Sequence, residues 1–126
     1  MIVGIGTDVI QVKRIGQAIE RFGNRFLKRI FTALEIEYCS SRRNADLHYA
    51  GRFAAKESAF KAMQRGWGGD VSWTDIEVYN EPSGAPRIRF QGKALEIVQS
   101  MNMTRAHVSI SHIEEVAVAM VALERD

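Results

Sequence analysis

The chain has little cysteine, little proline and no long apolar segment. Its 126 residues include one cysteine, Cys39, and only two prolines. A single thiol cannot form an internal disulfide, and one cysteine with scattered histidines does not provide the usual ligand set of a zinc site. No apolar run approaches the roughly 20 residues that cross a bilayer. These absences argue against a disulfide-stapled scaffold, a zinc finger and a membrane-spanning helix.

The net charge is also small. Lys and Arg number 17 against 15 Asp and Glu, which gives a net charge of +2. This balance does not indicate a nucleic-acid-binding protein, so any basic surface must be local. The start of the chain lacks the basic region and cleavage site of a secretory signal, and we expect a cytoplasmic protein. Its length fits a single domain over residues 1–126.

Hydrophobic periodicity predicts an α+β fold with a largely antiparallel sheet packed by helices on one side. Strands are predicted over 2–10, 74–79, 87–91, 106–112 and 116–123, and helices over 11–22, 33–43, 46–65 and 93–101. Turn-forming residues at 81–86 predict a hairpin between the second and third strands. The segment 116–123 is so continuously apolar that we expect both of its faces to be buried.

Glu57 is the most informative residue. Helical spacing puts Tyr49, Phe53 and Phe60 on one face, and Glu57 falls inside that apolar arc. A carboxylate on a core-facing stripe must be protonated, paired or bound to a cation. Lys61, one turn further on, could instead form an ordinary helix ion pair with it.

Asp8 is a second carboxylate in apolar surroundings. It lies near the end of the glycine-punctuated strand 2–10. Two carboxylates from distant segments, Asp8 and Glu57, suit a hard divalent cation such as Mg²⁺, which keeps several waters and is completed by substrate phosphates. Alternatively, Asp8 could cap the helix that follows the strand.

Basic residues surround Glu57 and also follow the first helix. Arg52, Lys56 and Lys61 flank the Glu57 stripe, where they could grip phosphates or simply form a solvated face. Arg14 and Arg21, with Arg25 nearby, form a basic ridge. The apolar stripe opposite this ridge consists of Val12, Ile15, Ile19 and Phe22. The ridge could dock an acidic partner by complementary charge or could serve solubility alone.

The strand 106–112 alternates between polar and apolar residues. One face carries His107, Ser109 and Ser111, and the other carries Val108, Ile110 and His112. The polar face could be a pocket wall or the solvent side of an edge strand. Nothing in the sequence supplies the geometry of a Ser-His-Asp triad.

Three segments together resemble the bacterial holo-[acyl-carrier-protein] synthases, the small class of 4′-phosphopantetheinyl transferases. They are Gly4–Val9, Arg52–Ala62 and His107–His112, and the resemblance extends over nearly the whole chain. It implies the fold of that family and Mg²⁺-dependent transfer of phosphopantetheine from coenzyme A to a serine of apo acyl carrier protein. It further implies release of adenosine 3′,5′-bisphosphate, a role in fatty acid biosynthesis, and a homotrimer with active sites between subunits.

The resemblance also implies roles for individual residues. Asp8 and Glu57 match the magnesium ligands, and Glu57 or a metal-bound water would take the serine proton. Lys61 would neutralise pyrophosphate charge as the bond to the leaving group breaks. The residues matching coenzyme contacts are Arg52, Lys56, Lys61, Gly84, Pro86 and His107. The residues matching the carrier-docking helix are Arg14, Arg21 and Arg25.

The chain departs from the family pattern at three places. The usual Gly-Thr-Gly loop after the long helix is replaced by Gln64–Gly69, Ser58 stands where Ala is usual, and Ala85 stands where Lys is common. Two other functions remain open. One is a Mg²⁺-dependent hydrolase of small nucleotides built on the same carboxylates. The other is a trimeric binding module for acidic proteins, with Glu57 merely paired to Lys61.

Overall fold

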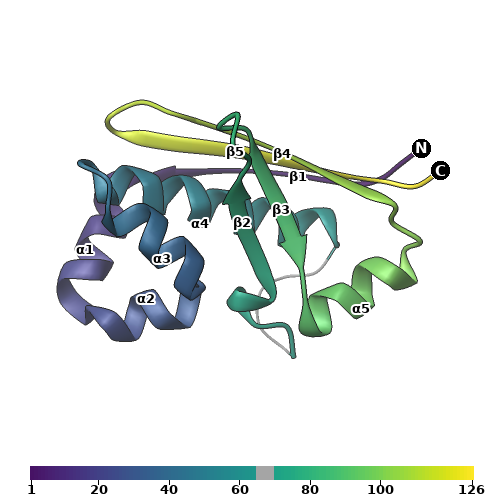
Figure 1. The fold of residues 1–126 in the computed structure, drawn as a ribbon, viewed down its shortest axis with the longest axis horizontal. Coiled ribbons are helices and arrows are strands. Elements are labelled where there is room, and N and C mark those ends of the chain that lie inside the picture. The colour runs from purple at the N-terminus through teal and green to yellow at the C-terminus, as the bar shows by residue number, and fades with distance from the viewer. Residues whose placement is uncertain (65–69) are drawn as a thin grey trace.

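A three-stranded antiparallel sheet forms one layer of the molecule (Figure 1). The computed structural model describes residues 1–64 and 70–126. The sheet consists of β1 (Ile2–Gln11), β5 (Val116–Glu124) and β4 (Arg105–His112), with β5 in the middle. The β1–β5 ladder runs from Ile2 opposite Glu124 to Gln11 opposite Val116. The termini therefore meet at one end of the sheet, as Figure 1 shows.

Helix α4 (Ala45–Ala62) lies against the inner face of this sheet. The approach to β1 is so close that a Cβ at Gly4 would collide with the carbonyl of Ala62, and one at Gly6 with the carbonyl of Ser58. Only glycine fits at these two positions. The glycines before Asp8 thus serve helix–strand packing, and they bring the end of β1 against the second half of α4.

The remaining elements cover the other sides of α4 (Figure 1). Three short helices, α1 (Val12–Phe22), α2 (Asn24–Ile30) and α3 (Ala33–Ser40), gather at one end of the molecule. A short 3₁₀ turn, Trp73–Asp75, leads into the hairpin of β2 (Ile76–Asn80) and β3 (Pro86–Phe90). Helix α5 (Gly92–Ser100) then leads back to β4. Within the described ranges, no helix has the length and apolar character needed to span a membrane.

The predicted α+β class and the antiparallel pairing are confirmed. The capping box of Thr32 and Glu35 opens α3 as expected, and Gly23 ends α1 with a φ of 58°. The sequence interpretation missed α2, a helix of 7 residues without a side-chain cap. Helix α4 ends at Ala62, whereas the predicted end at Arg65 and the glycine loop 66–69 lie outside the described residues.

Two predictions about burial were wrong. Strand β5 is not buried on both faces, because Val118 and Met120 are 40% and 45% exposed. They share the outer face of the sheet with the exposed residues Ile5 and Val9 of β1. The apolar residues of β5 therefore line an uncovered face as well as the core. The second wrong prediction concerns the face of α4 that carries Glu57.

Helix α4 has no single core-facing stripe. The sheet covers one of its sides and α1, α3 and β2 cover others, so that 11 of its 18 residues are buried. Glu57 lies on the least covered face, together with Phe53 and the exposed Lys61. The predicted arc failed because a central helix is buried nearly all round, and the position open to solvent is then the informative one.

Candidate active site

A cleft of about 390 Å³ lies between β1, α1, α2 and α4, and we call it the carboxylate cleft. The charged side chains that line it are Asp8, Arg14, Glu57 and Lys61. The structure thus joins Asp8 of β1 to Glu57 and Lys61 of α4, as the sequence predicted. Phe26 and Phe53 supply part of its apolar wall. Charged groups held against an apolar wall are less well solvated than on an open surface.

The charges of this cleft act on one another. Burial raises the pKa of the Glu57 carboxyl and the Asp8 carboxylate raises it further, while the Lys61 ammonium lowers it. Lys61 Nζ donates to the Thr7 carbonyl at 2.9 Å and to Asp8 Oδ1 at 3.3 Å. The ion pair that Lys61 forms is therefore with Asp8 rather than Glu57. Asp8 is not the cap of α1, whose N-cap is Gln11 without a side-chain bond.

Asp8 and Glu57 fit a magnesium ion. Two carboxylates that disfavour each other's ionisation gain from a cation placed between them. In the part of the chain that the structure describes, no group of three or more His, Cys, Asp or Glu side chains could hold a metal. Two protein oxygens suit Mg²⁺, since this ion retains several waters and takes further ligands from substrate phosphates.

A second cleft, of about 190 Å³, opens between α3, α4, the β2–β3 hairpin and β4. We call it the arginine cleft. Its polar and aromatic lining residues include Tyr38, His48, Arg52, Asn80 and His112. Gly84 and Pro86 of the hairpin also line it, so the sequence prediction grouped Arg52, Gly84 and Pro86 correctly.

Arg52 is held rigidly in this cleft. It is 5% exposed, and its Nη2 donates to Asn80 Oδ1 at 2.5 Å. Asn80 Nδ2 in turn donates to the Gly84 carbonyl at 2.9 Å, which ties the turn of the hairpin to the arginine. The guanidinium lies 3.8 Å from the centre of the Tyr38 ring. Its buried Nε–H finds no hydrogen-bond partner among the described residues, and this leaves a donor available to an anion.

Two histidines complete the arginine cleft. The rings of His48 and His112 are 5.8 Å apart and meet edge to face. Burial lowers the pKa of His48, and the neighbouring His112, Arg42 and Arg52 lower it further. His48 is therefore held as a neutral imidazole near pH 7, where it can both donate and accept a hydrogen bond.

Two predicted coenzyme contacts do not lie in either cleft. His107 is exposed, lies five residues before His112 on β4, and forms a bond of 3.0 Å with Glu124. His112 lines the arginine cleft in its place, and strand alternation already put His112 on the face opposite His107. Lys56 is 0% exposed and pairs with Glu35 in the core, so its charge is not presented at the helix edge.

Helix α4 separates the two clefts. Glu57 and Lys61 face one cleft, whereas Gly51 and Arg52 face the other. The clefts also lie at opposite edges of the sheet, since one includes residues of β1 and the other residues of β4, with β5 between these strands. A ligand that needed both clefts could not occupy them within one chain without crossing α4.

The basic ridge lies beside the carboxylate cleft. Arg14 lines the cleft itself, while Arg21 and Arg25 stay on the surface. Arg21 lies 5.2 Å from the ring of Phe22, which is 51% exposed and not part of the core as predicted. A small hollow between α1 and α2 is lined by Phe22, Arg25, Phe26 and Arg29. The ridge thus combines cations with an exposed aromatic ring.

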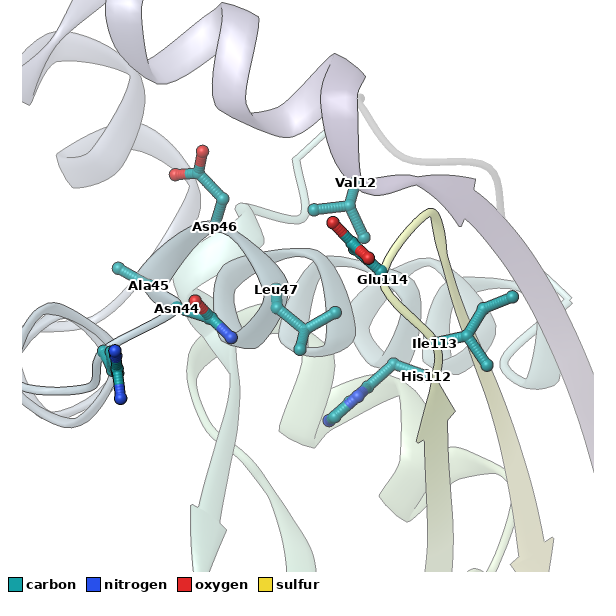
Figure 2. Close-up of a pocket in the computed structure, with 9 residues that line it drawn as sticks. Val12, Asn44, Ala45, Asp46, Leu47, His112, Ile113 and Glu114 are labelled. Atoms are coloured by element: carbon teal, nitrogen blue, oxygen red, sulfur yellow. The ribbon is translucent and has the colours of Figure 1, made fainter.

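A third cleft, of about 730 Å³, carries no predicted residue and adjoins the arginine cleft through His112. Figure 2 shows it between side chains from the β4–β5 turn on one side and from the start of α4 on the other. Arg43 and His112 are mixed there with Asp46 and Glu114, so no single charge dominates.

Comparisons of sequence agree with this geometry. Residues 4–121 match the 4′-phosphopantetheinyl transferase superfamily. A holo-[acyl-carrier-protein] synthase of Koribacter versatilis is 52% identical, covering 98% of this chain and 99% of the relative. One from Syntrophus aciditrophicus is 43% identical, covering 98% of this chain and 97% of the relative.

Solved structures give the same picture. The holo-[acyl-carrier-protein] synthase of Neisseria meningitidis superposes with a TM-score of 0.89 at 34% identity, covering 99% of this chain and all of that chain. The Helicobacter pylori protein, solved in complex with coenzyme A, gives a TM-score of 0.84 at 34% identity over 95% of this chain and 99% of that chain.

Proposed function

Because the chain belongs to the 4′-phosphopantetheinyl transferase superfamily, among its holo-[acyl-carrier-protein] synthases, we propose that it transfers phosphopantetheine from coenzyme A to a serine of apo acyl carrier protein. The observation that carries this proposal is the meeting of Asp8, Glu57 and Lys61 in one cleft. The reaction requires Mg²⁺ and releases adenosine 3′,5′-bisphosphate. We place the enzyme in the cytoplasm and in fatty acid biosynthesis.

The chemistry is a phosphoryl transfer. The serine oxygen bonds to the phosphorus that carries pantetheine, the bond from this phosphorus to the bridging oxygen breaks, and adenosine 3′,5′-bisphosphate leaves. Asp8 and Glu57 hold Mg²⁺, which supplies charge stabilisation at the phosphates when bound. Lys61 moves from Asp8 to the pyrophosphate and neutralises charge on the leaving group.

The serine must also lose a proton. Glu57 lies in the cleft and can accept it, as can a water beside the metal. A carboxylate that binds a cation holds protons less tightly, so the two roles of Glu57 oppose each other. Burial next to Asp8 raises the pKa of Glu57, and this works in favour of the role as base.

The nucleotide end of coenzyme A occupies the arginine cleft in our proposal. The support is the buried Nε–H of Arg52 without a partner, together with the imidazoles of His48 and His112. A phosphate group would satisfy the arginine donor with a charge-assisted bond. The Helicobacter pylori relative was solved with coenzyme A, which supports the ligand class.

A homotrimer follows from the position of the two clefts. One coenzyme molecule needs the carboxylate cleft for its pyrophosphate and the arginine cleft for its nucleotide, yet α4 separates them within a chain. A ring of copies would place the β1 edge of one copy beside the β4 edge of the next and so complete each site. The exposed Ile5, Val9, Val118 and Met120 give the sheet an apolar outer face that such a ring would cover.

The carrier protein docks on the ridge of Arg14, Arg21 and Arg25 in this proposal. The support is proximity, because Arg14 lines the carboxylate cleft and the other two arginines lie on the adjoining helices. A carrier bound there would present its serine close to Glu57. Charge complementarity at an exposed ridge chiefly raises the association rate and weakens with salt.

The direct test is the mass of purified apo acyl carrier protein after incubation with this protein, coenzyme A and Mg²⁺. We expect a gain of one phosphopantetheine group, and no gain when a chelator removes the metal. An unmodified carrier, under conditions in which a known transferase modifies it, would contradict the proposal. Release of adenosine 3′,5′-bisphosphate without a modified carrier would instead indicate a hydrolase.

Mixing two inactive variants tests the shared site. Glu57→Gln removes the carboxylate cleft of a chain, and Arg52→Gln weakens its arginine cleft. When the two are refolded together in equal amounts, random rings contain roughly one quarter of sites with both clefts intact. We expect that fraction of the wild-type rate, whereas sites contained in one chain would give no recovery.

A further inference from the structure

Lys56 and Glu35 form an ion pair in the core that neither the metal site nor the anion site uses. Their Nζ and Oε1 atoms are 2.7 Å apart, and both side chains are 0% exposed. Lysine and glutamate are almost never fully buried unless they are paired. Lys56 belongs to α4 and Glu35 to α3, so the pair connects two helices.

The ammonium of Lys56 has no donor left for a ligand. Its three N–H bonds match three acceptors: Glu35 Oε1, the Trp73 carbonyl at 3.1 Å and the Ile76 carbonyl at 2.6 Å. Burial lowers the pKa of Lys56, while the charge and hydrogen bond of Glu35 raise it. The two carbonyls belong to the short turn before β2 and to the first residue of β2.

The carboxylate of Glu35 is equally occupied. Its Oε2 accepts from the Val78 N–H at 2.7 Å, in the middle of β2, and its Oε1 accepts from the Thr32 N–H at 2.8 Å. The Thr32 hydroxyl donates to Glu77 Oε2 at 2.6 Å, which adds a further link to the same strand. The ion pair thus bonds to the backbone of residues 73–78 at three points.

We propose that the Glu35–Lys56 pair is a positioning device that fixes the β2–β3 hairpin against α4 and thereby forms the arginine cleft. Asn80, Gly84 and Pro86 lie on this hairpin, whereas Arg52 lies on α4 one turn before Lys56. The distance between these two groups of residues depends on how β2 sits on the helix. The inference rests on the proposed function only for the identity of the ligand.

The apolar contacts between α4 and β2 do not fix this position well. They involve the small side chains of Ala54 and Ala55 against Val78. Such smooth surfaces exclude water but tolerate small shifts, whereas an ammonium and a carboxylate with all their bonds directed accept one arrangement. Stability alone is a weak reason for the pair, because well-packed apolar residues often replace buried ion pairs without loss.

The double variant Glu35→Met/Lys56→Met tests the inference without leaving a buried charge unpaired. We expect it to fold and to keep its kcat at saturating coenzyme A within about twofold of wild type. Its KM for coenzyme A and its Kd for adenosine 3′,5′-bisphosphate should each rise about tenfold, the loss of roughly one charge-assisted hydrogen bond. Hydrogen exchange should accelerate in β2 and β3 and stay unchanged in the three-stranded sheet.

The control is Arg87→Gln, which breaks the exposed Arg87–Glu81 pair of 2.7 Å on the same hairpin. It should leave KM and hydrogen exchange unchanged, because exposed pairs contribute little. If the double variant does not fold, Glu35→Gln gives the same comparison, since the amide keeps the shape and one acceptor.

Three results would overturn the inference. A folded variant with unchanged KM, Kd and hairpin exchange would leave the pair with no positioning role. A fall in kcat with unchanged KM would mean that the pair orients the carboxylate cleft instead. Exchange that accelerates evenly over the whole chain would show general destabilisation. If wild type transfers nothing, the proposed function fails, while the exchange comparison still tests the positioning role.

Discussion

The two clefts on either side of α4 hold their charges in different ways. In the carboxylate cleft, Lys61 is exposed and reaches Asp8 across 3.3 Å, and Glu57 has a carboxylate neighbour of the same sign. In the arginine cleft, Arg52 is buried and bonded to Asn80 at 2.5 Å. The first arrangement leaves charges free to rearrange around a cation and a reacting phosphate. The second is preformed, which suits recognition of a group that does not react.

Two lysines of α4 show the same contrast. Lys56 and Lys61 are five residues apart, yet the side chain of one is 0% exposed and that of the other 53%. All three N–H groups of Lys56 are bonded in the core, whereas Lys61 makes one ion pair at the mouth of a cleft. Lysines that look equivalent in the sequence therefore divide into one that supports the site and one that can act in it.

The largest effect should come from the reacting side. Glu57→Gln removes a metal-ligand charge, and we expect the rate of carrier modification to fall by at least about 100-fold, since even groups behind metal ligands contribute 10–100-fold. The fold should persist, because the change removes a carboxylate that burial and Asp8 disfavour. Transfer rate and thermal unfolding in chelator measure the two effects.

The matched control for this change is Glu96→Gln, an exposed glutamate on α5. It should alter neither rate nor stability by a measurable amount. Wild-type rates in Glu57→Gln would remove Glu57 from the reaction and favour the binding module. A variant that unfolds would mean that the carboxylate is needed for the fold.

The binding side should respond in KM rather than kcat. Arg52→Gln removes the guanidinium and its unpartnered donor. Hydrogen bonds to charged groups are worth about 1.5–3 kcal/mol, so we expect KM for coenzyme A to rise roughly 10-fold to 100-fold while kcat changes little. An equal fall in kcat with unchanged KM would erase the difference between the clefts.

Most of the fold could be predicted because its signals are local. Alternation and helical spacing identify four helices and five strands, and a capping box marks the start of α3. Helix α2 escaped because it is short and has no cap, although Phe26, Leu27 and Ile30 have helical spacing. The outer face of β5 was misjudged because apolar character does not tell whether a second layer covers a strand.

The site could be predicted less completely. Asp8, Glu57 and Lys61 were found because charged residues in apolar segments stand out and because the motifs resemble a family. Tyr38, His48 and Asn80 come from three separate elements, and only the folded chain brings them to Arg52. Lys56 was misplaced because burial on α4 depends on which elements surround the helix, and periodicity carries no record of that.

Close packing of β1 on α4 sets the geometry of the carboxylate cleft, and Gly6→Ala would disturb it. A Cβ there meets the Ser58 carbonyl, and overpacking typically costs about 1–3 kcal/mol. We expect a lower unfolding free energy and a reduced transfer rate with KM for coenzyme A nearly unchanged. Gly84→Ala provides contrast, because no atom lies within 4 Å of its added Cβ, although its φ of 93° adds backbone strain.

The docking ridge should give a smaller and salt-dependent effect. Arg21→Glu/Arg25→Glu leaves Arg14 and both clefts intact. We expect KM for the carrier protein to rise about tenfold at low salt and less at high salt, with KM for coenzyme A unchanged. The control is Arg87→Glu, which reverses a charge on the hairpin. Equal carrier affinity of variant and wild type at low salt would exclude docking at this ridge.

The smallest effect should come from His107, five residues from His112 on the same strand. Its imidazole binds Glu124 outside both clefts, so His107→Gln should leave KM for coenzyme A within about twofold, whereas His112→Gln should raise it. The hydrogen bond from His107, with help from Arg105, lowers the pKa of Glu124 from its ordinary 4.5.

A carboxyl with a lowered pKa stabilises the fold above its ordinary value, and this contribution disappears as the pH falls through the lowered pKa. His107→Gln should therefore be slightly less stable than wild type at neutral pH and equal to it in strong acid, as thermal unfolding over a pH series would show. A tenfold rise in KM for His107→Gln, with His112→Gln unaffected, would mean that the nucleotide lies along the outer face of β4 instead of in the arginine cleft.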